Sequence, residues 1–306
     1  MELLLPYIKV LPGAVAEGLI WGLMAIGVYI SYKILDIADL TVDGSICTGA
    51  CVCAVLLVAG VPAWVAMLVA FLAGALTGIL TGVFNTALGI PSILAGILTQ
   101  LILYSVNLFV LSGKSLLAIN RFVDKPMLHM SNVPMACLVA GVVVVLTIVL
   151  LKQFFYTEIG LTLKSTGDNP DMSRAQGVNV KLNKVLGLAI SNGIVALSGS
   201  LLAQYKGSAN INDGRGAIVI GLAAIFIGLS VSLRIKPNFV VSLIGVVCGS
   251  IVYYVIYNYV ILMGIKTDYL KMLSAVIVVV FLATPYIKGT YFVKRKSLNA
   301  GGGRNA

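Results

Sequence analysis

The stretch YTEIGLTLKSTGDNPDMSRAQGVNVKLNK, residues 156–184, is the long polar segment that separates two strongly apolar parts of the chain. Within it, Asn169 is suited to cap a helix, and Pro170 fits the first helical position because that position needs no backbone donor. Gly177 offers a left-handed stop. The sequence therefore predicts a helix of about two turns over 170–176, outside the membrane. A docking element and an ordinary solvated loop both remain possible at this point.

The composition on either side of this stretch excludes a soluble globular protein. Of the 306 residues, 59% are hydrophobic and only 10% are charged. A membrane-spanning helix needs about 20 mostly apolar residues, so the chain has room for roughly eight or nine transmembrane or re-entrant helices. The sequence predicts an all-α integral membrane protein with one transmembrane domain over residues 1–306.

The formal net charge of +10 does not indicate nucleic-acid binding, because the basic residues are scattered through loops between apolar segments. Lipid headgroups and protein partners are the expected neighbours. The cysteines fall in apolar runs and are interpreted as small buried hydrophobes. We expect no metal site, since His129 is the chain's single histidine and lies far from them in the sequence.

Nine apolar segments are expected to cross or enter the membrane: 13–32, 33–61, 63–87, 91–111, 134–155, 185–205, 217–233, 239–262 and 270–287. Threading them alternately places about thirteen basic residues on one side and about eight on the other, and the richer side is assigned to the cytoplasm. The N-terminus is then outside. The loop 156–184 and the C-terminus are inside, and the tail 297–306 has the composition of a disordered end.

The second of these segments is unusual because it carries Asp36, Asp39 and Asp43 before its apolar part. Irregular backbone at membrane depth survives only inside protein or beside a watery cavity, so a broken or re-entrant helix lining a path is one interpretation. A cytoplasmic turn with hydrated aspartates is the other. In the first segment, Glu17 is expected at the membrane interface.

Gly74, Gly78 and Gly82 follow one another at four-residue spacing, which is the pattern that lets membrane helices pack closely. Thr77, Thr81 and Asn85 form a polar stripe beside these glycines, while Thr99, Gln100, Asn107 and Asn192 are polar residues of other apolar segments. Helix packing explains such a stripe more often than a substrate site does. Asp39, Asp43, Asn85 and Asn192 are nevertheless the candidates for a substrate path.

The tyrosines near the end of segment 239–262 are typical of a membrane interface, with ligand stacking as the alternative. The motif SGKS at 112–115 lacks the glycine that a phosphate-binding loop requires, because Leu108 stands in its place. We therefore expect no ATP site on this chain.

Two stretches carry a resemblance to a known family: GLIWGLMAIGVYISYKILDIADLTVDGSICTGA, residues 18–50, and GDNPDMSRAQGVNVKLNKVLGLAISNGIVALSGSLLAQY, residues 167–205. The chain resembles the membrane permease subunits of ABC importers, in the class that includes branched-chain amino acid and ribose permeases. In that family the central loop forms a coupling helix that docks into the ATPase. The resemblance assigns this role to Gly167, Asp168, Asn169, Pro170, Asp171, Met172, Ser173, Arg174, Ala175, Gln176 and Gly177.

The resemblance also implies an assembly in the bacterial cell membrane. It contains a second permease copy, two cytoplasmic ATP-binding subunits that hold ATP and Mg, and an extracytoplasmic solute-binding protein. This chain would then have no catalytic residues and no cofactor of its own. The wording DLTVDGS at 39–45 looks closest to tryptophan or tyrosine permeases. The implied solute is an amino acid, aromatic or branched-chain, with a ribose-type sugar as the alternative.

Two other classes of protein fit less well. A secondary transporter usually shows repeated discontinuous helices, and the two halves of this chain match poorly. An intramembrane enzyme needs a nucleophile, a base or a metal site, which the isolated cysteines and distant His129 do not supply.

Overall fold

The structure is a computed structural model that describes residues 5–119, 128, 130, 132–232, 238–263, 272, 275, 276 and 279. Four residues of the expected segment 270–287 are therefore described, and the rest of it lies outside this set. The tail 297–306 and His129 also lie outside it.

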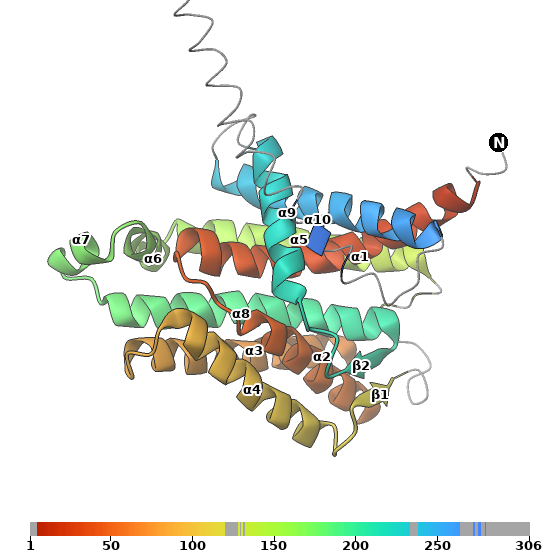
Figure 1. The fold of residues 1–306 in the computed structure, drawn as a ribbon, viewed down its shortest axis with the longest axis horizontal. Helices are drawn as coiled ribbons and strands as arrows, with labels where there is room; N and C mark the ends of the chain where they lie inside the picture. The colour runs from red at the N-terminus through yellow and green to blue at the C-terminus, as the bar shows by residue number, and fades with distance from the viewer. Residues whose placement is uncertain are drawn as a thin grey trace, which may run out of the picture.

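The described chain is almost entirely helical. Its elements are α1 (Leu5–Tyr29), the π-helix η1 (Ile30–Ile34), α2 (Val42–Val58), α3 (Ala63–Thr86), α4 (Ser92–Val110), β1 (Leu116–Ala118), α5 (Val133–Phe155), α6 (Glu158–Asp168), α7 (Pro170–Ala175), α8 (Val180–Lys206), β2 (Ser208–Asn210), α9 (Ala217–Ser232) and α10 (Phe239–Leu262). The small antiparallel sheet of β1 and β2 lies at one end of the bundle, and α6 and α7 lie at the other (Figure 1).

Six helices in the described part of the chain are long and apolar enough to cross a membrane: Val10–Ile34, α3, α4, α5, α8 and α10. The apolar helices α2 and α9 are shorter. The structure thus supports a helical, multi-pass membrane protein with six candidate spans, and the expected number of eight or nine is not reached among the described residues. The sheet of β1 and β2 was not expected from the sequence.

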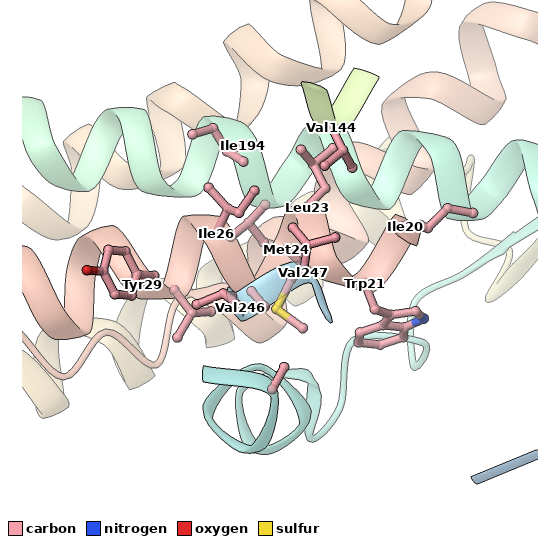
Figure 2. Close-up of a cluster of buried hydrophobic side chains, with 14 of the residues drawn as sticks. Ile20, Trp21, Leu23, Met24, Ile26, Tyr29, Val144, Ile194, Val246 and Val247 are labelled. Carbon is pink, nitrogen blue, oxygen red and sulfur yellow. The ribbon is translucent and has the colours of Figure 1, made fainter. Parts of the chain in front are cut away.

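Helices α1 and α8 form the centre of the bundle. In each of them 78% of the most apolar window is buried, against 28% in α3, α4 and α5. A helix that is apolar on all sides belongs in the interior, and α1 fits this rule. Figure 2 shows side chains of α1, among them Met24 and Ile26, beside Val144 of α5, Ile194 of α8 and Val247 of α10.

The outer helices present large apolar side chains away from this core. Leu76 of α3, Leu101 of α4 and Val145 of α5 are each at least 60% exposed. Lipid tails or a partner's helices satisfy such a surface, whereas water would not. The packing therefore places α3, α4 and α5 at the rim, and the polar groups described below lie among α2, α3, α4 and α8.

Candidate functional site

The first helix does not lead directly into the second. After η1 the backbone is not helical from Leu35 to Thr41, and Asp36 adopts a left-handed φ of 54°. This linker is packed inside the protein, since Leu35 and Ile37 are 3% and 5% exposed. Of the two interpretations of the aspartate segment, the interrupted helix buried in protein is the one that fits Asp39, which is only 2% exposed.

Asp39 is held by hydrogen bonds to both of its carboxylate oxygens. Oδ1 accepts a bond of 2.9 Å from the backbone N–H of Thr41, and Oδ2 accepts one of 2.7 Å from the amide of Asn192. The amide oxygen of Asn192 accepts in turn from Ser45 Oγ at 2.6 Å, and Ser45 lies 2.7 Å from Thr77 Oγ1. These bonds offset part of the cost of burying the carboxylate, and they tie the linker to α2, α3 and α8.

Three threonines extend this arrangement toward α4. Thr41 Oγ1 lies 2.7 Å from Thr81 Oγ1, and Thr81 donates to Thr99 at 3.0 Å. We call the connected set the polar centre; its members are Asp39, Thr41, Ser45, Thr77, Thr81, Thr99 and Asn192, and none is more than 5% exposed. The polar centre is closed to solvent in this conformation, so a solute passing through it requires these bonds to change partners.

Asp43 lies in the first turn of α2 but points to a different helix. Its two carboxylate oxygens accept hydrogen bonds from the backbone N–H groups of Gly216, at 2.8 Å, and Ile218, at 2.9 Å. It therefore caps α9, whose first N–H groups would otherwise lack acceptors. The positive ends of two helix dipoles, those of α2 and α9, meet at this carboxylate.

A pocket of about 470 Å³ opens beside Asp43, between α2, α4 and the segment 211–215. Its polar lining includes Gln100, Tyr104 and Asn107 of α4, and the guanidinium of Arg215 lies 6.0 Å from the centre of the Tyr104 ring. We call this the lateral pocket. Among the described residues, Asn107 Oδ1 has no hydrogen-bond partner although the residue is only 1% exposed. A polar group that is buried without a partner costs free energy.

The glycine stripe of α3 packs directly on α8. A Cβ atom at Gly74 would meet Ala196, one at Gly78 would meet the carbonyl oxygen of Leu188, and one at Gly82 would lie 2.8 Å from Val185 Cα. The close approach brings Thr77 and Thr81 into the polar centre. Asn85 has a local role instead, because its amide donates to the carbonyl of Ile90 at the α3–α4 connection, at 2.9 Å.

At the opposite end from the β-sheet, the predicted short helix is present as α7. Asn169 Oδ1 accepts from the N–H of Met172 at 3.0 Å, and Gly177 adopts a left-handed φ of 84°. The cap and the stop are thus confirmed, and the helix ends one residue before the expected Gln176. Arg174 forms an exposed ion pair of 3.2 Å with Asp171.

The sequence analysis did not anticipate α6, which occupies part of the expected loop. A Cβ at Gly167 of α6 would overlap the carbonyl oxygen of Ile34, so α6 rests on the last turn of η1. Asn183 of α8 also donates to Thr166 of α6 at 3.0 Å. The contacts therefore run from α7 through α6 and η1 to the linker that holds Asp39. Apolar side chains at this end are exposed: Ile159, Leu161, Met172 and Leu182 are each at least 53% exposed.

The structure brings together only some of the predicted path residues. Asp39 and Asn192 are bonded to each other, Asp43 lies in the lateral pocket, and Asn85 belongs to a turn. The sequence analysis missed Arg215 and Tyr104. One feature of the sequence could have identified Arg215, which is its charge in the short polar run between two apolar segments. No residue pattern near it indicates that this run folds back against α2.

Comparison with known proteins adds independent information. Residues 13–282 match the family described as branched-chain amino acid transport system, permease component. The tyrosine transport system permease protein of Clostridioides difficile (strain R20291) is 37% identical over 93% of this chain and 92% of its own length. The probable ABC transporter permease protein YphD of Escherichia coli (strain K12) is 27% identical over 49% of this chain and 43% of its own.

The xylose transport system permease protein XylH of Haemophilus influenzae (strain ATCC 51907 / DSM 11121 / KW20 / Rd) is 29% identical over 40% of this chain and 30% of its own. No solved structure matches the chain. The family comprises membrane permease subunits that are not enzymes themselves. The chain belongs to the permease family of branched-chain amino acid transport systems, in the branched-chain and ribose class of ABC permeases and close to those for aromatic amino acids.

Proposed function

We propose that this chain is the permease subunit of an ABC importer and forms the path by which an amino acid, preferably an aromatic one, crosses the bacterial cell membrane. The observation that carries the proposal is the 37% identity to a tyrosine transport permease over 92% of that protein. Because this chain and the tyrosine permease are related over almost their whole lengths, we infer that they share a class of solute as well as a fold.

The geometry supports a path for a small polar solute. The polar centre and the lateral pocket place carboxylate, amide and hydroxyl groups between apolar helices. Polar groups inside a membrane protein are costly unless they serve packing or a solute. The lateral pocket, whose polar lining includes Gln100, Tyr104 and Arg215, is the part of this region with room for a small polar solute.

The proposed assembly holds two copies of the permease, two cytoplasmic ATP-binding subunits and one solute-binding protein outside the cell. ATP and Mg bind to the ATP-binding subunits, where hydrolysis takes place. Within the permease, residues 1–306 form one transmembrane domain of eight or nine membrane helices, in which α2, α9 and the segment 270–287 supplement the six candidate spans.

The proposed orientation places the N-terminus and the β1–β2 end outside and α6, α7 and the C-terminus in the cytoplasm. Residues Gly167 to Gly177 then form the element that docks into the ATPase. The exposed Met172 and the exposed Arg174 suit such a contact, because apolar anchors and arginine are common at protein interfaces. The contacts of α6 with η1 would pass ATPase motion to Asp39.

A sugar importer is the second candidate. It is supported by the similarity to a xylose permease, which covers 40% of this chain. The two solute classes differ in charge. An amino acid has an ammonium group for Asp43 and a carboxylate for Arg215, whereas a sugar has neither.

Uptake by the native host tests the proposal. A strain that lacks the gene, and the same strain carrying it on a plasmid, would be compared for uptake of radiolabelled tyrosine. Unlabelled tryptophan, leucine, ribose and xylose serve as competitors. We expect gene-dependent uptake of tyrosine that tryptophan inhibits and the sugars do not. Gene-dependent uptake of a sugar, with no effect on tyrosine, would contradict the proposal.

A further inference from the structure

A second pocket, of about 420 Å³, lies on the other side of the segment that leads into α9. It is lined by Glu17 and Trp21 of α1, Tyr254 and Tyr257 of α10, and Arg215. We call it the aromatic pocket. Figure 2 shows Trp21 pointing from α1 toward the segment before α9. Its volume falls within the range of about 300–1,000 Å³ that is usual for small-molecule sites.

The aromatic wall of this pocket is fixed by stacking. The Trp21 and Tyr254 rings lie 5.7 Å apart with an interplanar angle of 28°, and Tyr254 meets Tyr257 at 5.7 Å. Trp21 and Tyr254 are 6% and 5% exposed. The tyrosines near the end of α10 therefore do not all serve as interface anchors, because Tyr254 turns into the protein. Offset and tilted rings at these distances form a stable surface for another aromatic ring.

Four charged residues line the pocket. Two of them form an ion pair with each other, and the other two, Glu17 and Arg215, do not. Lys206 forms an ion pair of 3.6 Å with Asp213, and its charge also acts on Glu17 from beyond ion-pair distance. Glu17 receives only a long hydrogen bond of 3.5 Å from Asn258, and Arg215 lies over the Tyr104 ring. In the part of the chain that the structure describes, neither Glu17 nor Arg215 has an ion-pair partner. One acid and one base thus remain beside an aromatic wall.

We propose that the aromatic pocket binds a zwitterionic aromatic amino acid, with its ammonium group at Glu17, its carboxylate at Arg215 and its ring against Trp21, Tyr254 and Tyr257. The inference rests on the proposed function for its solute class and adds the residues that recognise the solute. A carboxylate and a guanidinium are the natural partners of the two charged ends, and tyrosine and tryptophan supply a ring that branched-chain amino acids lack.

Arg215 gives this site a place on the route. It lines both the aromatic pocket and the lateral pocket, and the segment 211–215 that carries it lies between them. A solute bound through Arg215 in the aromatic pocket can keep the same guanidinium when it moves to the lateral pocket beside Asp43. The aromatic pocket and the lateral pocket are therefore two neighbouring subsites that share Arg215.

Equilibrium binding to the purified, full-length permease in lipid nanodiscs tests the site without ATPase or binding protein. Radiolabelled L-tyrosine is expected to bind saturably. Glu17→Gln and Arg215→Gln should each weaken binding at least about tenfold, the size of one lost charge-assisted hydrogen bond. Glu158→Gln and Lys114→Gln are the matched controls, because they remove the same charges from residues outside both pockets, and they should change the affinity less than about twofold.

A second experiment varies the ligand and uses the wild-type protein, so its result does not depend on whether a pocket variant folds. N-acetyl-tyrosine lacks the ammonium charge and tyrosine amide lacks the carboxylate, and both should compete at least about tenfold less well than tyrosine for the wild-type protein. Trp21 supplies an internal reporter in a Trp64→Phe background, because the chain has 2 tryptophans and Trp64 is 62% exposed. Tyrosine and phenylalanine should change its fluorescence, whereas leucine should not.

Three results would overturn the site. The first is tyrosine affinity that both pocket variants leave unchanged, and the second is the absence of saturable tyrosine binding to folded permease. The third is competition by phosphoethanolamine but not by phenylalanine, which would assign the pocket to a lipid headgroup. If any of these results is found while cells still show normal gene-dependent tyrosine uptake, the proposed site is wrong and the proposed function is retained. Loss of the proposed function itself is recognised by uptake that does not depend on the gene.

Discussion

Asp39 accepts a hydrogen bond of 2.7 Å from the amide of Asn192, although 153 positions separate the two residues in the sequence. The bond joins the non-helical linker after η1 to the central helix α8. The linker in turn begins where α6 packs on Ile34, so one short path connects the exposed α6–α7 end with the buried polar centre.

Replacing Asp39 by Asn should destabilise the permease. An asparagine can still accept from Thr41, but its NH₂ group then faces the NH₂ group of Asn192, and reversing Asn192 would break the bond of 3.0 Å that its NH₂ group donates to the carbonyl of Leu188. The expected loss is on the order of 2 kcal/mol. Thermal unfolding in detergent measures it. Asp36→Asn is the control, because Asp36 is exposed and asparagine tolerates its positive φ. Equal unfolding midpoints for the two variants would contradict the role given to Asp39.

Gly78→Ala should disturb the contact between α3 and α8. The added methyl group would overlap the backbone at Leu188, which cannot rotate away as a side chain can, so we expect a loss of about 1–3 kcal/mol. Gly141→Ala on α5 is the matched control, since its Cβ would meet no atom within 4 Å. That change should be neutral or stabilising by up to about 1 kcal/mol, because alanine favours the helix. Similar effects of the two substitutions on yield and unfolding would rule out the contact.

Much of the local structure was predictable from the sequence, because caps, stops and apolar runs act over a few residues. The cap at Asn169 and the stop at Gly177 fixed α7, and α10 has the bounds expected for segment 239–262. The four-residue glycine spacing indicated a helix contact but could not identify α8 as the partner. Helix α6 was missed because its residues are more polar than a span, although Thr157 caps it and Glu158 lies in its first turn.

The candidate sites were less predictable, since they depend on contacts between distant segments. Asp43 was expected beside Asp39 on a path, yet it caps α9, and this pairing depends on a chain reversal before Ala217. The pairing of β1 with β2 likewise joins Leu116 to Asn210 across four helices, α5 to α8. The same chain reversal places Arg215 between the aromatic pocket and the lateral pocket. Local patterns in a sequence do not encode such contacts.

The orientation across the membrane can be measured with single cysteines. The native Cys137 and Cys248 are accessible to different degrees and are first replaced by alanine. Lys114→Cys, next to β1, should react with an impermeant maleimide added to intact cells. Arg174→Cys on α7 should react only after the cells are permeabilised, because the basic excess places α7 in the cytoplasm. The reverse pattern would show that the assigned orientation is inverted.

The double variant Arg174→Glu, Gly177→Val tests α7 as the docking element. The first change reverses an exposed charge and breaks the ion pair with Asp171, and the second forces a β-branched residue into a left-handed conformation. A helix of six residues contributes little to membrane folding, so expression and stability in detergent should stay near normal. Co-purification of a nucleotide-hydrolysing subunit should be lost.

Lys181→Glu is the control for this variant, because it reverses an exposed charge in the first turn of α8, outside residues 167–177. It should retain most of the co-purifying ATPase. If the double variant co-purifies the ATPase as well as the control does, α7 is a plain connector.

The energy source of uptake tests the central claim most directly. Intact host cells that carry the wild-type gene are assayed for radiolabelled tyrosine uptake, once with a protonophore while glycolysis maintains ATP and once with arsenate to deplete ATP. An ABC permease should keep gene-dependent uptake when ion gradients collapse and lose it when ATP is depleted, and the double variant of α7 should lose it in both conditions. Uptake that stops with the ion gradients, survives ATP depletion and is normal in the double variant would contradict the account and indicate a secondary transporter.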